Sequence, residues 1–321
     1  MTTDAHDPIF PPIPKDFCMP FYYSSLSLFA VYYRVERSVL EPFLERTGLQ
    51  AARFRTSAKG PVDEDHGYAS VEFQNYTGFG GQYLETCNEV EFNIHAFPVS
   101  EKHKVPRISF RDYLLGQEQT KTIGSLRVDV PADNAFAVKA GADIFGEQKF
   151  FTSFHYAVPS LNTPGVTAWN YTVLDPKYKL PADPAKYHPK PRDIIYSISA
   201  DFAALESTPA TPSPITLYSL VDLGDPCRKK PPVGSCLDRR RKHYGPNDRL
   251  DASRWEIRGE FATYFLTGKQ ANTVHLSCGK SRDPMRRNME AVLGKRPKPA
   301  AIRVFVSIPA AVENRPFYVE M

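Results

Sequence analysis

Proline is the feature of this sequence that most restricts its fold. The chain of 321 residues contains 29 prolines, and 12% of its residues are aromatic. Proline interrupts a helix interior because its ring removes a hydrogen-bond donor and clashes with the preceding turn. Aromatic residues are instead typical of strands. The composition therefore argues against a helical bundle and favours a β-rich fold.

Strand-like segments with alternating side-chain character run through most of the chain. Each is rich in aromatic and β-branched residues, which indicates strands. Four lie in the first part of the chain: 24–36, 67–76, 88–99 and 123–131. The later ones are 149–159, 166–175, 193–205, 215–224, 254–266, 271–278 and 301–309.

Helix signals occur at three places. The segment 37–50 has the pattern of a short helix. A second helix is predicted to begin at the Asp133–Asn134 cap and to run toward Gly146. In a third, "DPMRRNMEAVLGK", Asp283 caps, proline occupies the first helical position and Gly294 ends the helix.

We expect one domain of the α+β class, mainly β. Residues 1–20, with five prolines, are predicted to form an N-terminal arm, and residues 21–321 a single domain. Two proline-rich, charged stretches at 175–192 and 225–249 are predicted to be loops.

Charge and cysteine content indicate an ordinary soluble protein. The net charge is +4, and the start of the chain lacks the apolar core of a signal peptide. We therefore predict a cytoplasmic protein with no membrane partner. Cys227 and Cys236 could close a loop in an oxidising compartment, but two reduced thiols are the favoured interpretation.

Other motifs carry little chemistry. The glycine-rich 77–82 lacks the strand-to-helix context of a phosphate loop, so a tight turn is favoured. The eight histidines show no metal-ligand spacing, and we predict no metal site. The basic cluster at 228–243 lies among prolines with no nucleic-acid module around it. We interpret it as a solvated loop and expect no nucleic-acid partner.

The segment "AGADIFGEQKFF" (140–151) places Lys149 among large apolar side chains. A lysine in an aromatic strand is commonly an exposed edge residue that blocks aggregation. The alternative is chemical. A free lysine titrates at about 10.4, and surrounding it with phenyl rings would penalise the ammonium form and leave a neutral, nucleophilic amine. Such an amine attacks a ketone to form an iminium.

This segment resembles the active-site segment of the acetoacetate decarboxylase family. There, a helix ends in Gly-Arg-Glu and the Schiff-base lysine follows after a short spacer. The match places that lysine on Lys149 and the helix-end glutamate on Asp143. "SVEFQNYTGFGGQYLET" (70–86) is similar to the family's strand–loop–strand and sets its two active-site glutamates on Glu72 and Glu85. "AVYYRVERSVLEPFLERTGL" (30–49) resembles its first strand and helix, so the likeness covers roughly 20–160.

The resemblance implies a cone-shaped closed barrel with a few peripheral helices and a Schiff-base lyase that needs no cofactor. Lys149 would be the nucleophile, Glu85 the proton shuttle, and Glu72 would shape the pocket. We also expect Asp143, Phe145 and Phe150 to contact the substrate, and the protein to be a homo-oligomer.

Decarboxylation of a β-keto acid is the reaction we predict first. An aldol, dehydration or cyclisation step with the same lysine is the alternative, because the family's active-site arginine would fall near Leu26, where this chain has no cation. A third hypothesis is a non-catalytic barrel that binds an apolar ligand.

Overall fold

Two β-sheets form the body of the protein, and the alternating sequence pattern predicted a strand-rich chain of this kind. The computed structural model describes residues 13–45, 47–79, 84–160, 165–183, 186–222 and 248–308. Cys227, Cys236, the basic cluster at 228–243 and nearly all of the predicted loop at 225–249 lie outside these residues. The predicted division into arm and domain stays a prediction.

The larger sheet has eleven strands, of which nine follow one path. In spatial order these are β10 (Thr208–Ala210), β13 (Phe261–Phe265), β15 (Pro299–Val306), β1 (Tyr22–Glu36), β3 (His66–Phe79), β4 (Leu84–Pro98), β5 (Gly124–Ala132), β11 (Ile215–Asp222) and β12 (Asp248–Trp255). Off this path, β2 (Leu49–Ala51) pairs with β4, and β6 (Lys149–Phe151) pairs with β5. The pairs of β5 with β11 and with β6 are parallel.

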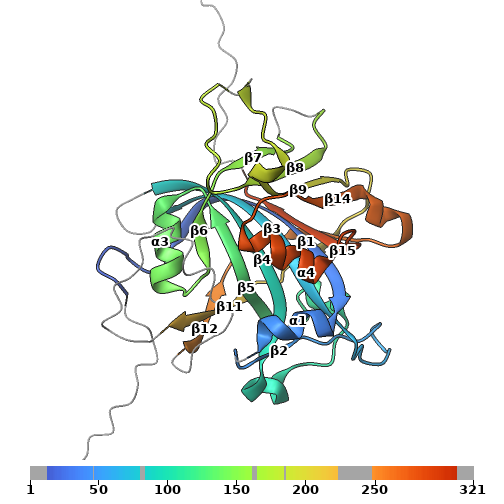
Figure 1. Cartoon of the computed structure of the whole chain (residues 1–321). Helices are drawn as coiled ribbons and strands as arrows, with labels where there is room; N and C mark the ends of the chain where they lie inside the picture. The colour runs from blue at the N-terminus through green and yellow to red at the C-terminus, as the bar shows by residue number, and fades with distance from the viewer. Residues whose placement is uncertain are drawn as a thin grey trace, which may run out of the picture.

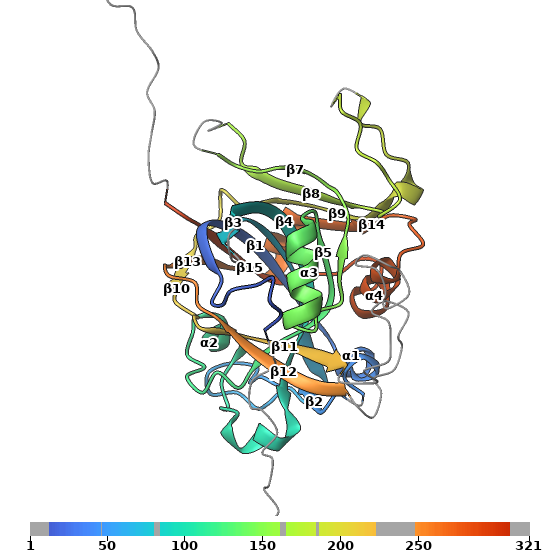
Figure 2. The same cartoon turned by 90° about the vertical axis from the view of Figure 1, so that its left-hand side faces the viewer.

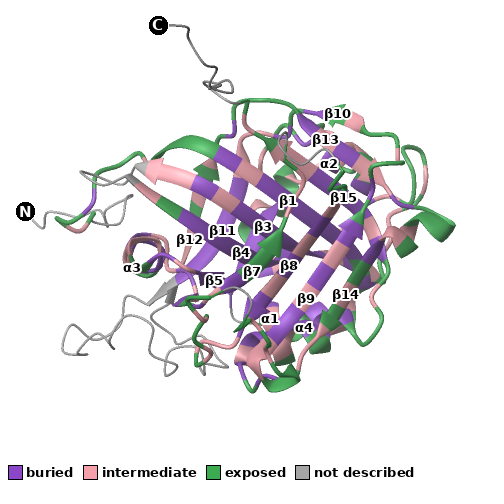
Figure 3. Cartoon of the chain, turned by 90° about the horizontal axis from the view of Figure 1, so that it is seen from above, coloured by how far each residue is buried: buried purple, intermediate pink, exposed green. Residues whose placement is uncertain are grey.

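A four-stranded sheet packs over one face of the larger sheet (Figure 2). Its strands, in spatial order, are β14 (Val274–Cys278), β9 (Ile194–Asp201), β8 (Ala168–Leu174) and β7 (Phe154–Ala157). Aromatic rings join the two layers: Phe29 stacks on Trp169 with centroids 5.4 Å apart, and Phe73 stacks on Tyr171. Seen from above, the two sets of strands run crosswise, and the central strands are mostly buried (Figure 3).

Helices are few and lie at the periphery (Figure 1). The α-helices are α1 (Arg37–Leu44), α2 (Phe110–Leu114), α3 (Ala135–Ile144) and α4 (Pro284–Leu293). The 3-10 turns are η1 (Val99–Lys104), η3 (Pro191–Asp193) and η5 (Gly268–Thr273). The caps predicted for α3 and α4 are present: the Asn134 side chain accepts from the Ala137 amide, and that of Asp283 accepts from the Met285 amide.

The α+β, mainly β class is confirmed, but the closed barrel is not. Among the described residues the large sheet is open, with β10 and β12 at the ends of its path. At one end β10 has only three residues, and its middle residue is Pro209. Proline has no N–H to donate to a further strand, so pairing stops there. Within the described residues, no helix is long and apolar enough to cross a membrane.

The central strands bury polar side chains as well as apolar ones. On β4, Val90, Phe92 and Ile94 point into the core between the sheets. The alternate residues Glu89, Glu91, Asn93 and His95 therefore share the opposite face, yet they too are buried. Buried charged groups need partners, so this second face of the large sheet is where a site is to be sought.

Asp283 gives a test of how α4 is held. Its side chain accepts a hydrogen bond at 2.9 Å from the Met285 amide, and the helix buries Met285 and Met289 in the core. Asp283→Ala should lower the free energy of unfolding by about 1 kcal/mol because it removes the cap. The measurement is urea unfolding. Asp283→Asn is the matched control, since it keeps an acceptor. Equal losses in the two variants would contradict the capping role.

Candidate functional site

Lys149 lies on β6, which runs parallel to β5 with Lys149 opposite Val130. Its side chain is only 6% exposed. The Nζ atom lies 2.8 Å from Oε2 of Glu89 on β4 and 3.1 Å from Oε2 of Glu147 in the turn after α3. The amine is thus held between two carboxylates that are themselves buried.

This contact is part of a longer chain of charges. Arg127 of β5 forms a buried ion pair with Oε1 of Glu147 and donates to the Ser219 hydroxyl at 2.8 Å. The order Glu89, Lys149, Glu147, Arg127 therefore alternates in sign, and its two positive charges balance its two negative ones. Such alternation is what allows four ionised groups to share a buried site.

A glycine on α3 permits this close approach. A β-carbon at Gly141 would overlap Cδ of Lys149 and the carboxylate of Glu147. The carbonyl of Gly141 also accepts from the Glu147 amide at 3.0 Å, which fixes the turn. The helix predicted to lead into the lysine segment therefore positions both charged residues.

The two carboxylates decide the charge of the amine. Burial alone would disfavour the ammonium, but Glu147 and Glu89 together outweigh it, so the pKa of Lys149 lies well above its ordinary value. In the same way Arg127 and Lys149 hold the pKa of Glu147 low in spite of its burial. The prediction of a neutral amine surrounded by phenyl rings is wrong for the structure as it stands: Lys149 is a buried, paired ammonium.

Two more carboxylates lie further along the same face. Glu72 of β3 stands directly opposite Glu91 of β4. The Asn93 amide bridges them, donating at 3.2 Å to Glu72 and at 3.0 Å to Glu91, and the Ser70 hydroxyl donates to Glu72 at 2.7 Å. Burial is the main reason that the pKa of Glu72 is raised. The predicted residue Glu72 thus lies on the buried second face of the large sheet. Its neighbouring charged residue there is Glu91 rather than Lys149.

Glu85 lies elsewhere. It is half-buried near the start of β4, and its carboxylate accepts at 2.7 Å from the side chain of Asn134, the cap of α3. Glu85 is four residues from Glu89, which is more than 10 Å along a strand by the usual rise of about 3.4 Å. Glu89 occupies the position beside the amine that we expected for Glu85.

The three residues expected to contact substrate make contacts with groups other than the amine, although the ring of Phe145 lies 5.9 Å from the guanidinium carbon of Arg127. Asp143 is ion-paired at 3.1 Å with Lys139 on the side of α3. Phe145 packs edge-on against Phe21, with the rings 6.0 Å apart. Phe150 follows Lys149 in the strand, so it points to the opposite face and is buried in the core between the sheets. Lys149 and Phe150 are thus adjacent in sequence, but the alternation of side chains along a strand places them on opposite faces.

Sequence reasoning missed Glu89, Glu91, Arg127 and Glu147. The signal for the first two was present, because polar residues occupy every second position of "EVEFNIH" (89–95). Alternation of this kind is ordinarily that of a strand with one solvated face. Only the tertiary structure shows that this face is buried.

The Glu72–Glu91 pair predicts a specific pH dependence of stability. Burial, aided by Glu72 and Glu89 and opposed by Arg127, raises the pKa of Glu91 from 4.5 to about 8. Between these values the folded protein holds a proton that the unfolded chain releases. Stability therefore falls as pH rises through this window, by up to about 1.4 kcal/mol per pH unit. Glu91→Gln should flatten the slope in urea unfolding from pH 5.5 to 8, whereas the exposed Glu260→Gln should not. An unchanged slope for Glu91→Gln would contradict the raised pKa.

Gly141 provides a second test of this geometry. Gly141→Ala should displace Lys149 and Glu147 and lower the free energy of unfolding by about 1–3 kcal/mol, the usual cost of overpacking. Gly165→Ala is the matched control, because none of the described residues lies within 4 Å of the added methyl group there. Thermal unfolding of the two variants makes the comparison, and equal stabilities would show that the site has room to spare.

Comparisons with known proteins bear on the fold. No protein-family model matches the sequence, and no curated protein matches it. Two structures of the enduracididine biosynthesis enzyme MppR superpose with TM-scores of 0.51 and 0.53, at 12% and 11% identity. They cover 90% of this chain and 85% and 84% of theirs. Acetoacetate decarboxylase from Legionella pneumophila superposes with a TM-score of 0.47 at 8% identity, over 94% of this chain and 93% of its own. This chain therefore shares its overall fold with MppR.

Proposed function

We propose that this protein is an enzyme that acts on a small keto acid through an iminium formed on Lys149. The observation that carries the proposal is a buried primary amine held 2.8 Å and 3.1 Å from two buried carboxylates. The fold adds support, because MppR, which shares it, is known in complex with the condensation product of pyruvate and imidazole 4-carboxaldehyde.

The raised pKa of Lys149 is compatible with this chemistry. An iminium carries the same positive charge as an ammonium, on the same nitrogen. Glu89 and Glu147, which stabilise the ammonium, therefore also stabilise the iminium. The site disfavours the neutral amine at rest and favours the charged intermediate, so the amine needs to be neutral only while it attacks.

Glu89 is the residue that we propose for the transient deprotonation. Its Oε2 lies 2.8 Å from Nζ and also accepts from the Tyr76 hydroxyl at 2.8 Å. A proton passed from Lys149 to Glu89 converts a buried ion pair into a neutral pair. The amine then attacks the ketone carbon, and the carbonyl oxygen leaves as water, taking one proton from the attacking nitrogen and the other from Glu89. Arg127, which reaches the site through Glu147, is the cation that we propose for the substrate carboxylate.

Decarboxylation is the reaction that we place first. The iminium draws the electron pair of the C–C bond toward nitrogen, CO₂ leaves, and an enamine remains. Loss of the carboxylate removes one negative charge from a site already rich in carboxylates. Glu91, whose raised pKa of about 8 keeps it protonated near neutral pH, is the proton donor that we propose for the enamine carbon. Water then hydrolyses the iminium, which releases the ketone and restores the ammonium, and Glu91 regains its proton from solvent.

A condensation is the second candidate, favoured by the product bound in MppR. In that reaction Glu89 would remove a proton from the carbon beside the iminium, and the enamine would attack an aldehyde. Release of CO₂ from a β-keto acid distinguishes decarboxylation from this reaction.

Access to the amine would be through an aromatic layer. Tyr23 packs edge-on against Tyr76 with centroids 5.0 Å apart, and Trp255 of β12 lies 6.0 Å from the ring of Tyr23. Tyr23 is 40% exposed. Tyr23 thus contacts both solvent and Tyr76, the hydrogen-bond partner of Glu89, and we propose that substrate enters where Tyr23 lies.

Replacement of Lys149 tests whether this residue forms the covalent adduct. A second substitution must compensate for the positive charge that is lost. Lys149→Ala alone would leave Glu89 and Glu147 buried beside no amine, which typically costs about 3–5 kcal/mol. The double variant Lys149→Met with Glu89→Gln removes one charge of each sign. We expect it to fold and to give no adduct when treated with borohydride and acetoacetate or pyruvate, whereas the native protein gains the mass of the reduced adduct.

The exposed Lys269→Gln is the control and should keep the adduct. Peptide mapping should place the modification on Lys149. If the native protein forms no adduct with any keto acid but binds apolar ligands, the hypothesis of a non-catalytic binding protein is favoured over that of an enzyme. An adduct that persists in the double variant would assign the chemistry to another lysine.

A further inference from the structure

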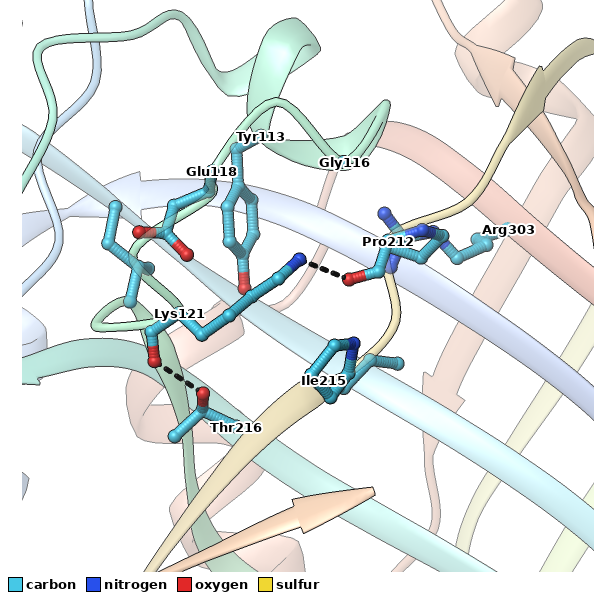
Figure 4. A pocket seen from close by; sticks show the side chains of 10 residues that line it. Tyr113, Gly116, Glu118, Lys121, Pro212, Ile215, Thr216 and Arg303 are labelled. Atoms are coloured by element: carbon cyan, nitrogen blue, oxygen red, sulfur yellow. Dashed lines mark hydrogen bonds between the residues drawn. The ribbon is translucent and has the colours of Figure 1, made fainter. Parts of the chain in front are cut away.

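A second group of buried charges lies far from Lys149, at the other end of β4. There His95 contacts the Tyr113 hydroxyl at 3.3 Å, six residues beyond Glu89. Six residues of strand span roughly 20 Å. A pocket opens beside Tyr113, between the segment that follows α2, the residues that lead into β11, and Arg303 of β15 (Figure 4).

Arg303 is the residue of this pocket with an unmet hydrogen-bonding need. It is 5% exposed. Its guanidinium donates to the Tyr32 hydroxyl at 3.3 Å and to the Leu114 carbonyl, while its Nε–H has no acceptor. Among the described residues, no carboxylate lies within ion-pairing distance of it. A buried guanidinium is costly when its Nε–H has no acceptor and no carboxylate forms an ion pair with it. A bound anion would supply both the acceptor and the counter-charge.

Lys121 brings a second cation to the same pocket. Its Nζ donates to the Pro212 carbonyl at 2.8 Å (Figure 4). Partial burial lowers the pKa of Lys121, and the charges of Arg254 and Arg303 lower it further against the opposing effect of Glu118. Arg254 is close because it donates at 2.6 Å to the backbone carbonyl of Lys121. The positive charges of Lys121, Arg254 and Arg303 therefore lie close enough to repel one another.

Glu118 is the carboxylate of the pocket lining, and it is already engaged. Oε1 of Glu118 accepts from the Thr120 hydroxyl and, at 3.4 Å, from the Thr122 amide of its own loop. The pocket lining holds Lys121 and Arg303 against Glu118, an excess of one positive charge, and the exposed Arg254 lies beside it. The local field thus favours a negatively charged ligand.

The rest of the lining has an apolar part, formed by Ile123, Pro212, Pro214 and Ile215, and is completed by Tyr113, Gly116 and Thr216. A ligand that satisfies both parts carries one oxyanion and a small aliphatic group. Inorganic phosphate satisfies only the charge, whereas a short aliphatic carboxylate satisfies both.

We propose that this pocket binds a small monocarboxylate, with its carboxylate on Arg303 and Lys121 and its aliphatic chain against Ile123 and Ile215. The site is separate from Lys149 and does not depend on the function proposed above. It has a route of influence on the interior, because Arg303 lowers the pKa of Glu72. A bound carboxylate would offset that charge and favour the protonated form of Glu72.

Calorimetric titration of the full chain with butyrate, acetate and inorganic phosphate tests the proposal. Butyrate has no ketone and cannot form an iminium, so Lys149 chemistry does not contribute. We expect saturable binding of butyrate, weaker binding of acetate and the weakest binding of phosphate. Lys121→Gln should weaken butyrate binding about tenfold through loss of a charged hydrogen bond, and Lys269→Gln should leave it unchanged.

Two further variants make the outcome decisive. Ile215→Thr should reduce the preference for butyrate over acetate while leaving acetate binding as it was. The Lys149→Met, Glu89→Gln variant should bind butyrate like the native protein. Absence of butyrate binding, equal binding of phosphate, or binding insensitive to Lys121→Gln in a variant that melts normally would each overturn the proposal. Loss of butyrate binding in the Lys149 variant would place the ligand at the other end of β4.

Discussion

The buried ion pair between Lys149 and Glu89 is the interaction on which the rest of the site depends. It joins β6 to β4 across the parallel pairing of β6 with β5, and it is continued by Glu147 and Arg127 to Ser219 on β11. Four strands are thereby linked through charged side chains. The energetic cost of burying such groups is large, and only their alternation in sign makes it tolerable. A protein that needed only a stable core would fill this space more cheaply with apolar residues.

The same alternation explains why the amine need not be neutral at rest. A lysine activated by an apolar environment has a low pKa, but its iminium is destabilised by that environment as much as the ammonium was. A lysine between two carboxylates has the opposite balance: the free amine is rare and the cationic intermediate is favoured. Glu89 therefore has two tasks in the proposed function, as the acceptor of the amine's proton and as the counter-charge of the iminium. Its hydrogen bond from Tyr76 fixes the oxygen that does both.

Much of the fold could be predicted from the sequence because local signals determine it. The caps Asn134 and Asp283, and the alternation along the strands, require only neighbouring residues. The site could not be predicted in the same way. Phe150 is beside Lys149 in sequence but on the other face of the strand, and Glu85 lies on the same strand as Glu89 but several residues too early. Which carboxylate meets the amine is set by the register of β4 against β5 and by the turn after α3, and neither is visible in a short motif.

The two ends of β4 differ in charge, and this difference has a consequence for the interior. Around Lys149 the positive and negative groups balance, whereas around Arg303 and Lys121 the cations are in excess. Glu72 and Glu91 stand between the two groups and share the bridging Asn93 amide. The protonation of this carboxyl pair depends on the charges at both ends of β4. The charge of Arg127 acts to lower the pKa of Glu91, and the charge of Arg303 acts to lower the pKa of Glu72. An anion at Arg303, or one that draws Arg127 away from the interior, would favour protonation of the pair. In the proposed function, the proton for the enamine carbon would then be most available when anions are bound both beside Arg127 and beside Arg303.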